Sequence, residues 1–419
     1  MGRPIGVTRK ETTPLTRRLA MSSGNSPAAS FPEKTSWRAL LSPSTVIRLL
    51  ISWGVVLLFL LFGPAWLAEP VSSLAAISCF VVLFSTILYA AFGVVHEADC
   101  LADALGEPYG TLILTIAIVG IEVILITAVM LGPGESATIA RDSIFAVMMI
   151  ILNLVTGLCL LLGGLRYGEQ EYNSQGAAAY LSMIVLLTGT ALIIPNTLST
   201  GDGTLLAAQA FGLALITGVL YVAFLMLQMR GYRRFFVQPR QGALTIPLLT
   251  AQQAQRAERH DTARPAVNRR ATLLRSTILL ALILPIVLLA QDMAVLIDLG
   301  VNQTGAPVAV GGLIIAIIVF TPESLTAIRA ALADQMQRAV NLCLGAFVST
   351  VGLTVPVVLL IGLATQQTVI MGLSLLDTVS LAITLLLSGL TFLGLRTSPV
   401  QGMMHLALFA IYTLLLFVP

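Results

Sequence analysis

Two acidic residues stand alone inside long apolar stretches of this sequence. Glu122 is the only charged residue within Leu112–Met130, and Glu323 is the only charged residue within Leu313–Ile328. A carboxylate in such surroundings costs several kcal/mol unless it is paired, protonated or bound to a cation. The two glutamates are therefore candidates for binding cations and protons. The alternative is a neutral glutamate that is hydrogen-bonded inside a helix bundle.

The residues before each glutamate could shape such a site. Proline has no backbone N–H, so Thr321-Pro322-Glu323 predicts a break in its helix, with freed carbonyl groups facing a cation. Gly120 is the corresponding flexible point in the other stretch, although a lone glycine in a membrane helix usually serves packing. An interfacial ion pair with Arg329 or Arg338 is a further alternative for the second glutamate.

Oxygen-bearing side chains in the middle of other apolar stretches could complete a ligand shell. They are the amide of Asn153 and the hydroxyls of Ser349 and Thr350. Hydrogen bonding between helices explains them about equally well. His405 lies in the last apolar stretch, where we expect a buried histidine with satisfied hydrogen bonds rather than a proton relay.

An acidic segment follows the second apolar stretch. His96, Asp99 and Asp103 share one face at helical spacing, and Glu97 lies beside them. These four residues could gather cations at the inner mouth of a pathway. A solvated helix face is the more common explanation for such a segment.

The composition indicates that membrane helices position these side chains. The chain has 419 residues, is 57% hydrophobic and 10% charged, and has a mean hydropathy of +0.93. Strand-like alternation is absent, so helices must satisfy the backbone groups within hydrocarbon. We predict an all-α protein with eleven membrane spans, at Val46–Leu67, Val71–Phe92, Pro108–Leu131, Ser143–Leu165, Ala178–Ile194, Leu206–Leu227, Leu273–Ile297, Val308–Ala331, Val340–Leu363, Asp377–Leu395 and Met403–Val418.

The basic residues support this number of spans. With the N-terminus in the cytoplasm, every Lys and Arg of the chain except Arg141 falls on the cytoplasmic side. The charge pattern is thus explained by topology, and it gives no reason to expect nucleic-acid binding. We predict a multi-pass protein of a bacterial inner membrane, with the lipid bilayer, inorganic cations and protons as its partners. The sequence leaves the oligomeric state open.

The spans divide into one leading helix and two sets of five with opposite orientation, which is an inverted repeat. The second helix of each set carries one of the two glutamates. The third helices carry the matching pairs Gly157-Leu158 and Gly352-Leu353. The expected division is a disordered cytoplasmic tail over 1–43, a leading helix over 44–70, a first repeat over 71–229, a basic cytoplasmic loop over 230–272 and a second repeat over 273–419.

No enzyme or cofactor motif stands out in the sequence. A Walker loop, a Gly-Xaa-Ser-Xaa-Gly elbow and a His-Glu-Xaa-Xaa-His motif are all absent, so we expect neither an enzyme nor a bound cofactor. The cysteines have no metal-like spacing and are expected to be buried small hydrophobes. Either Met1 or Met21 could be the start.

Two long motifs around the glutamates resemble those of bacterial calcium/proton antiporters, which belong to the cation/calcium exchanger superfamily. The first runs from Gly106-Glu107-Pro108-Tyr109-Gly110 to Ile121-Glu122-Val123. The second runs from Thr321-Pro322-Glu323 to Arg329-Ala330-Ala331 and is followed by Gly352-Leu353-Thr354-Val355-Pro356. The resemblance extends over roughly Val46 to Pro419.

The resemblance implies alternating-access exchange, with both glutamates at a transported Ca²⁺ ion where the repeats meet. Some bacterial members of the superfamily exchange Na⁺ or K⁺ for protons, and this alternative stays open. The superfamily often has Gly-Asn before its first glutamate, whereas this chain has Gly120-Ile121. The central loop is rich in arginine, so we expect no regulatory Ca²⁺ site there. A channel or uniporter and an intramembrane metalloenzyme using His96, Glu97 and Asp99 are the rival hypotheses.

The topology can be tested with single cysteines. A cysteine at Gln252 should be shielded from an impermeant thiol reagent in intact cells, because the basic central loop is predicted to be cytoplasmic. A cysteine at Thr200, in a predicted outer loop, should be labelled. Equal labelling rates at the two positions would contradict the predicted orientation.

Overall fold

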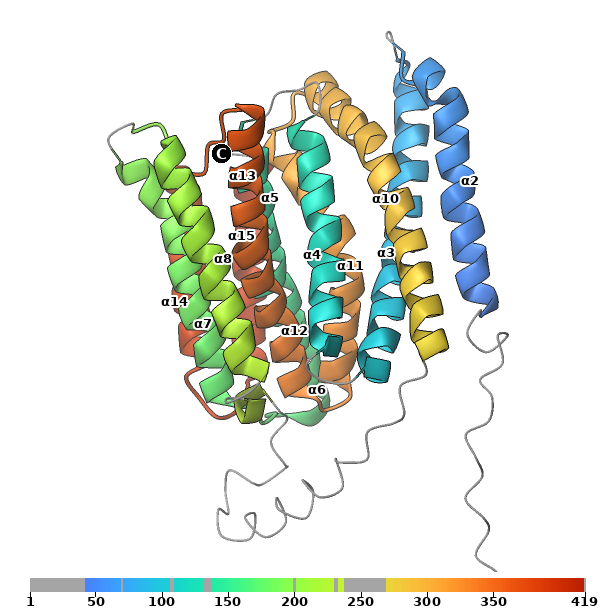
Figure 1. Ribbon diagram of the computed structural model, residues 1–419. Helices are drawn as coiled ribbons and strands as arrows, with labels where there is room; N and C mark the ends of the chain where they lie inside the picture. The colour runs from blue at the N-terminus through green and yellow to red at the C-terminus, as the bar shows by residue number, and fades with distance from the viewer. Residues whose placement is uncertain are drawn as a thin grey trace, which may run out of the picture.

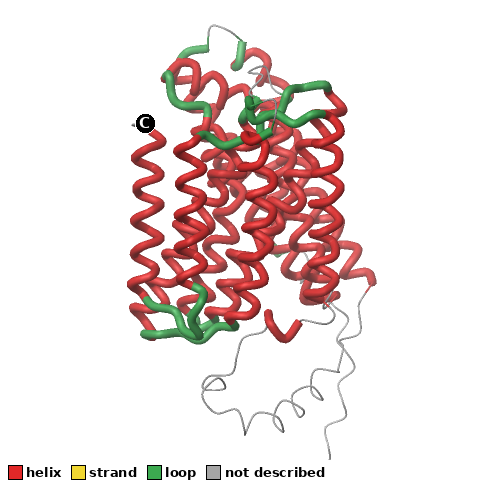
Figure 2. The backbone as a smooth tube through the Cα atoms, turned by 90° about the vertical axis from the view of Figure 1, so that its left-hand side faces the viewer, coloured by secondary structure: helices red, strands yellow, loops and turns green. Residues whose placement is uncertain are grey.

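Apolar helices make up nearly all of the chain that the computed structural model describes. A segment in lipid must satisfy its backbone hydrogen bonds internally, and the helix achieves this with local bonds alone. The helices run side by side in one bundle, and the loops gather at its two ends (Figure 2). The described residues are 42–68, 71–105, 109–131, 137–198, 201–229, 233–236 and 269–417.

The described residues form eleven spans, which confirms the predicted all-α architecture. Nine of these spans are long and apolar enough to cross a membrane, and the apolar parts of the other two, Ile116–Met130 and Leu375–Thr391, are shorter. The leading helix is α2, Pro43–Trp66. The first repeat contains α3 (Ser73–Leu105), α4 (Tyr109–Met130), Ile139–Tyr167, Ser174–Thr197 and α8 (Ala207–Met229). The second repeat contains α10 (Arg269–Thr304), α11 (Ala309–Leu332), Met336–Thr365, α14 (Leu375–Thr391) and α15 (Pro399–Phe417).

The first helix of each repeat is longer than the sequence predicts. Both α3 and α10 extend beyond their apolar spans, and they pack closely together. Gly93 permits this contact, because a Cβ there would lie 2.9 Å from Leu282 Cδ1. At one end of the pair Arg275 donates to Glu97 at 3.0 Å, and Thr45 of α2 donates to the same carboxylate at 3.3 Å. Glu97 thus joins three helices.

The predicted break at Pro322 is wrong, because α11 continues through it. Proline leaves one carbonyl of the preceding turn without its usual donor, but hydroxyl groups hold the turns on either side. Thr321 donates to the Ile317 carbonyl at 2.5 Å, and Thr326 donates to the Pro322 carbonyl at 3.0 Å. The other helix, α4, likewise continues through Gly120.

The irregular backbone lies instead in the third helix of each repeat. The span Ile139–Tyr167 consists of α5 (Ile139–Met148), the π-helix η1 (Met149–Val155) and α6 (Thr156–Tyr167). The span Met336–Thr365 has the same plan, with α12 (Met336–Ser349), the π-helix η5 (Thr350–Thr354) and α13 (Val355–Thr365). The fourth span of the first repeat also has a π-helix, η2 (Gly189–Ile193), between α7 (Ser174–Thr188) and η3 (Ile194–Thr197). Single π turns occur often at functional sites.

The second and third helices of the two repeats interlock. Helix α4 packs against η5 of the other repeat, and α11 packs against α5, η1 and α6. Figure 1 shows α4 and α11 in the middle of the bundle, with α2 at one edge and α7, α8 and α14 at the other. Gly312 allows the approach of α11 to α5, because a Cβ there would lie 2.7 Å from the Ser143 backbone nitrogen. Small residues commonly permit such contacts in membranes.

We expect Gly312→Ala to destabilise the protein. The added methyl group would meet backbone atoms, which cannot rotate away, so we expect a loss of about 1–3 kcal/mol of folding free energy. Thermal unfolding of the detergent-solubilised protein would measure it. Gly54→Ala is the matched control, because nothing lies within 4 Å of a Cβ at that position. Equal melting temperatures for the two variants would contradict the close contact.

Candidate functional site

Glu122 is completely buried on α4, where it faces the π-helix of the second repeat. The hydroxyl of Thr350 donates to its Oε2 at 2.8 Å. A second hydroxyl, that of Thr354, also faces this carboxylate but forms no hydrogen bond within the described part of the chain. The other oxygen, Oε1, is buried without a partner. Glu122 therefore has one polar contact and one unused acceptor.

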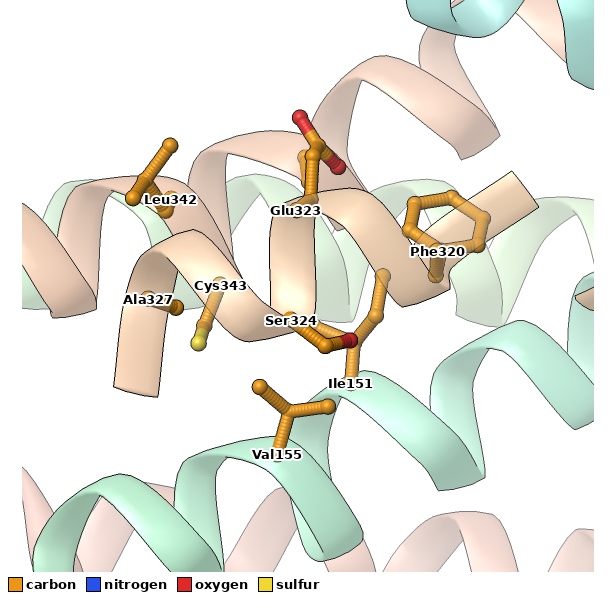
Figure 3. Close-up of a pocket in the computed structure, with 9 residues that line it drawn as sticks. Ile151, Val155, Phe320, Glu323, Ser324, Ala327, Leu342 and Cys343 are labelled. Atoms are coloured by element: carbon orange, nitrogen blue, oxygen red, sulfur yellow. The ribbon is translucent and has the colours of Figure 1, made fainter. Parts of the chain in front are cut away.

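Glu323 lies on α11, which packs against the π-helix of the first repeat. It lines a pocket of about 10 Å³ together with Ile151 and Val155 of η1 and Cys343 of α12. Figure 3 shows the carboxylate of Glu323 and the hydroxyl of Ser324 pointing in different directions from α11. The Oε2 atom of Glu323 is buried without a partner. Its surroundings are thus more apolar than those of Glu122.

The fold brings the two glutamates together from opposite repeats. Glu122 lies close enough to Glu323 to act on it electrostatically, and Asp99 of α3 does so as well. The ion pair with Arg329 or Arg338 that the sequence left open is absent among the described residues. The two carboxylates therefore share one region without a basic side chain to neutralise them.

The structure places only some of the supporting residues expected from the sequence in contact with a glutamate. Thr350 reaches Glu122, whereas Ser349 bonds to Tyr221 at 2.9 Å and to the Gly345 carbonyl at 2.8 Å. Asn153 points elsewhere, and its amide donates to Thr384 at 3.0 Å.

The other two supporting positions lie on the helices of the glutamates. Thr321 and Pro322 form part of the unbroken α11, and the Thr321 hydroxyl bonds within its own helix. Gly120 lies one turn or less from Glu122 and has open space beside it, since no atom lies within 4 Å of a Cβ there. Gly120 is therefore not needed for close helix packing at this position.

The acidic segment is part of α3, and its members have different surroundings. Asp99 lies close enough to Glu323 to act on it electrostatically, whereas Glu97 is buried in its contact with Arg275. His96 is exposed, with Nε2 4.0 Å from the sulfur of Cys100. The side chain of Asp103 lies outside the described residues. Asp99 is thus the member of this segment that approaches the paired glutamates.

Sequence reasoning missed two oxygen-bearing side chains that the structure reveals. Thr354 faces Glu122 because it follows Thr350 by four residues on η5, which is about one helical turn. This spacing was a usable signal in the sequence. Asp292 lies inside the apolar span of α10, partly buried, with its Oδ1 3.8 Å from a Cβ built at Gly63. The criterion that singled out Glu122, an acid within an apolar stretch, also applies to Asp292.

The chemistry of the site follows from its donors. Two carboxylates with unpartnered oxygens and nearby hydroxyls suit a hard cation, which prefers oxygen ligands, and they also suit protons. No group of three or more His, Cys, Asp or Glu side chains arranged to hold a metal ion occurs in the described part of the chain. The site is therefore a pair of carboxylates between two repeats.

Comparisons with known proteins identify the family. A Sinorhizobium fredii protein named as an ionic transporter, y4hA, is 34% identical over 79% of this chain and 86% of its own length. The sodium-potassium/proton antiporter ChaA of Escherichia coli is 32% identical over the same shares. The solved structure of YfkE superposes with a TM-score of 0.66 at 19% identity, covering 90% of this chain and all of YfkE.

The H⁺/Ca²⁺ exchanger CAX superposes with a TM-score of 0.61 at 14% identity, covering 89% of each chain. At these identities the two structures indicate a shared fold. The sodium/calcium exchanger protein family model matches this chain twice, at residues 75–230 and 271–418. This multi-pass membrane protein, whose two matched halves each carry one of the paired glutamates, belongs to the sodium/calcium exchanger family.

Proposed function

We propose that the protein is a secondary active antiporter that exchanges a metal cation for protons at Glu122 and Glu323. The observation that carries this proposal is the meeting of two carboxylates from opposite repeats, each with a buried oxygen that has no partner among the described residues. A proton or a cation can supply the missing interaction, and both cannot do so at the same oxygen. Competition for these oxygens couples the two fluxes.

The mechanism follows from the cost of burying charge. With a cation bound, or with both carboxylates protonated, the site carries little net charge. It can then switch from facing one side of the membrane to facing the other. The empty site would carry two unpaired negative charges through an apolar environment, which is strongly unfavourable. Because the empty form cannot cross, neither ion moves without the other. A channel or uniporter lacks this constraint.

We propose Ca²⁺ as the transported cation. Two carboxylates together cancel its charge, and the hydroxyls of Thr350 and Thr354 with backbone carbonyls or water would add oxygen ligands. The pocket at Glu323 has room for about one water molecule. YfkE, which shares the fold, is itself described as a Ca²⁺/H⁺ antiporter.

Na⁺ or K⁺ is the second candidate, and two observations favour it. The relative ChaA is named a sodium-potassium/proton antiporter. Ile151 and Val155 give the Glu323 side an apolar wall where a Ca²⁺ site would gain from further oxygens. One carboxylate with a few neutral oxygens is sufficient for a monovalent ion.

We place the protein in a bacterial inner membrane with its N-terminus in the cytoplasm. The distribution of basic residues supports this orientation. The first residue of α2 and the ends of α8 and α10 that flank the central loop lie at the same end of the bundle (Figure 1). This arrangement is consistent with all three helix ends lying on the cytoplasmic side of the membrane.

Exchange in everted vesicles tests the proposal. We expect Ca²⁺ addition to release protons from acid-loaded vesicles, with an apparent affinity that weakens steeply from about pH 8 to 6, because more than one proton competes for each ion. Na⁺ and K⁺ should give weaker and less pH-dependent responses. Glu122→Gln and Glu323→Gln should each abolish exchange while the protein remains inserted.

Near wild-type antiport by either glutamine variant in liposomes would contradict the proposed site. Strong Na⁺ or K⁺ exchange without a Ca²⁺ response would retain the site and reverse the choice of substrate. Cation flux with no opposing proton flux would identify a channel or uniporter.

A second variant tests the hydroxyl contact. Thr350→Val keeps the shape of the side chain and removes the donor to Glu122 Oε2, so we expect the apparent cation affinity to fall by about threefold to tenfold. Thr188→Val is the matched control, because its buried hydroxyl bonds to the Ile184 carbonyl of its own helix. If both variants bind the cation like the wild type, Thr350 does not belong to the site.

A further inference from the structure

The last helix of each repeat supports the π-helix of the other repeat. Helix α15 packs against η1 and α6, and α8 packs against η5 and α13. Glycines permit both contacts. A Cβ at Gly157 would lie 2.9 Å from Leu406 Cγ, and a Cβ at Gly352 would lie 2.7 Å from two ring atoms of Tyr221. The matching Gly-Leu pairs of the sequence therefore mark the two places where the repeats cross.

Each supporting helix, α15 or α8, carries at an equivalent position a polar side chain that contacts the third span of the other repeat. Gly402 and His405 on α15 have the same spacing as Gly218 and Tyr221 on α8. Tyr221 is buried and donates to Ser349, the residue just before η5, at 2.9 Å. His405 is completely buried and contacts η1 itself. The two contacts correspond in position and differ in chemistry.

His405 belongs to a chain of hydrogen bonds that is closed off from solvent. Its Nδ1 lies 3.2 Å from the amide oxygen of Asn153, and its Nε2 lies 3.1 Å from the hydroxyl of Thr391. The amide nitrogen of Asn153 donates to Thr384 at 3.0 Å. All four side chains are at most 1% exposed. Such a network holds its members in one arrangement, because a lost partner leaves a buried polar group unsatisfied.

This network lies on the opposite side of η1 from Glu323. Ile151 and Val155 line the Glu323 pocket, and Asn153 lies midway between them in sequence. Two residues along a helix amount to about half a turn, so Asn153 faces away from the residues that line the Glu323 pocket. The rotation of η1 about its axis thus decides which of its side chains line this pocket. The contact between His405 and Asn153 fixes that rotation.

We propose that His405 is a positioning residue for the Glu323 side of the exchange site. It holds Asn153 and thereby keeps Ile151 and Val155 of η1 in the pocket that Glu323 lines beneath α11. Tyr221 does the same for η5, where Thr350 meets Glu122. This inference rests on the proposed function of the two glutamates, and it assigns a task to a buried histidine that the exchange mechanism does not use.

The test compares His405→Phe with a double variant. His405→Phe keeps a ring and removes both nitrogens, so it should lower thermal stability and raise the apparent KM for the cation by about tenfold. In His405→Phe/Asn153→Leu both partners are apolar, and the stability should recover in part, because the hydroxyls of Thr384 and Thr391 still lose a partner. The raised KM should remain, because nothing then fixes the rotation of η1. Recovery of both quantities in the double variant would show a merely structural role and overturn the proposal.

Two further variants serve as references. Tyr172→Phe removes a buried hydrogen bond to the Gly394 carbonyl, at 2.8 Å, away from both π-helices, and should lower stability without changing KM. Tyr221→Phe should raise KM by less than His405→Phe, about threefold, because Ser349 keeps its bond to the Gly345 carbonyl. A stable His405→Phe protein with the KM of the wild type would also overturn the proposal.

Cation-dependent thermal stabilisation gives a second measure of binding that needs no transport. The cation concentration for half-maximal stabilisation should rise about tenfold in His405→Phe. Exchange or binding that survives Glu323→Gln would contradict the proposed function. An inactive Glu323→Gln protein beside an unchanged His405→Phe protein would contradict this inference alone.

Discussion

The structure depends on the burial of two neighbouring carboxylates without a permanent positive partner. Glu122 and Glu323 are brought together from opposite repeats, and each keeps an oxygen without a hydrogen bond. An arginine beside them would neutralise the site permanently and leave nothing for a transported ion to do. Among the described residues no fixed counter-charge lies beside them, so in the exchange that we propose the empty site is the unfavourable state.

The rest of the bundle keeps this pair in place. Each glutamate lies on an unbroken helix that packs against a π-helix from the other repeat. A π turn widens the helix and leaves backbone groups that need new partners, which are supplied from nearby. Thr156 donates to the Ile151 carbonyl at 2.8 Å. The irregular backbone expected at Gly120 and Pro322 is thus found on the partner helices.

The sequence predicts which acidic side chains lie within membrane spans, but it does not predict how each helix is rotated about its own axis. An isolated acid in an apolar stretch identifies a buried carboxylate from hydropathy alone, and span lengths follow from the thickness of the bilayer. Whether Asn153 faces Glu323 depends on the rotation of its helix within the bundle, which tertiary packing decides. The π-helices could not be predicted either, because the residues of η1 and η5 would also fit a regular helix. Pro322 was misleading because hydroxyl groups of its own helix hold the turns around it.

The inverted repeat makes the two halves similar in geometry and leaves their chemistry free to differ. Glu122 meets hydroxyl groups on η5, whereas the pocket that Glu323 lines is walled on the η1 side by the aliphatic Ile151 and Val155. Correspondingly, a tyrosine supports η5 and a histidine supports η1. Hydroxyl groups can add oxygen ligands to a cation and aliphatic side chains cannot, so the two sides of the carboxylate pair offer unlike coordination. The repeat therefore fixes where the two carboxylates lie, and the residues of each π-helix decide what surrounds them.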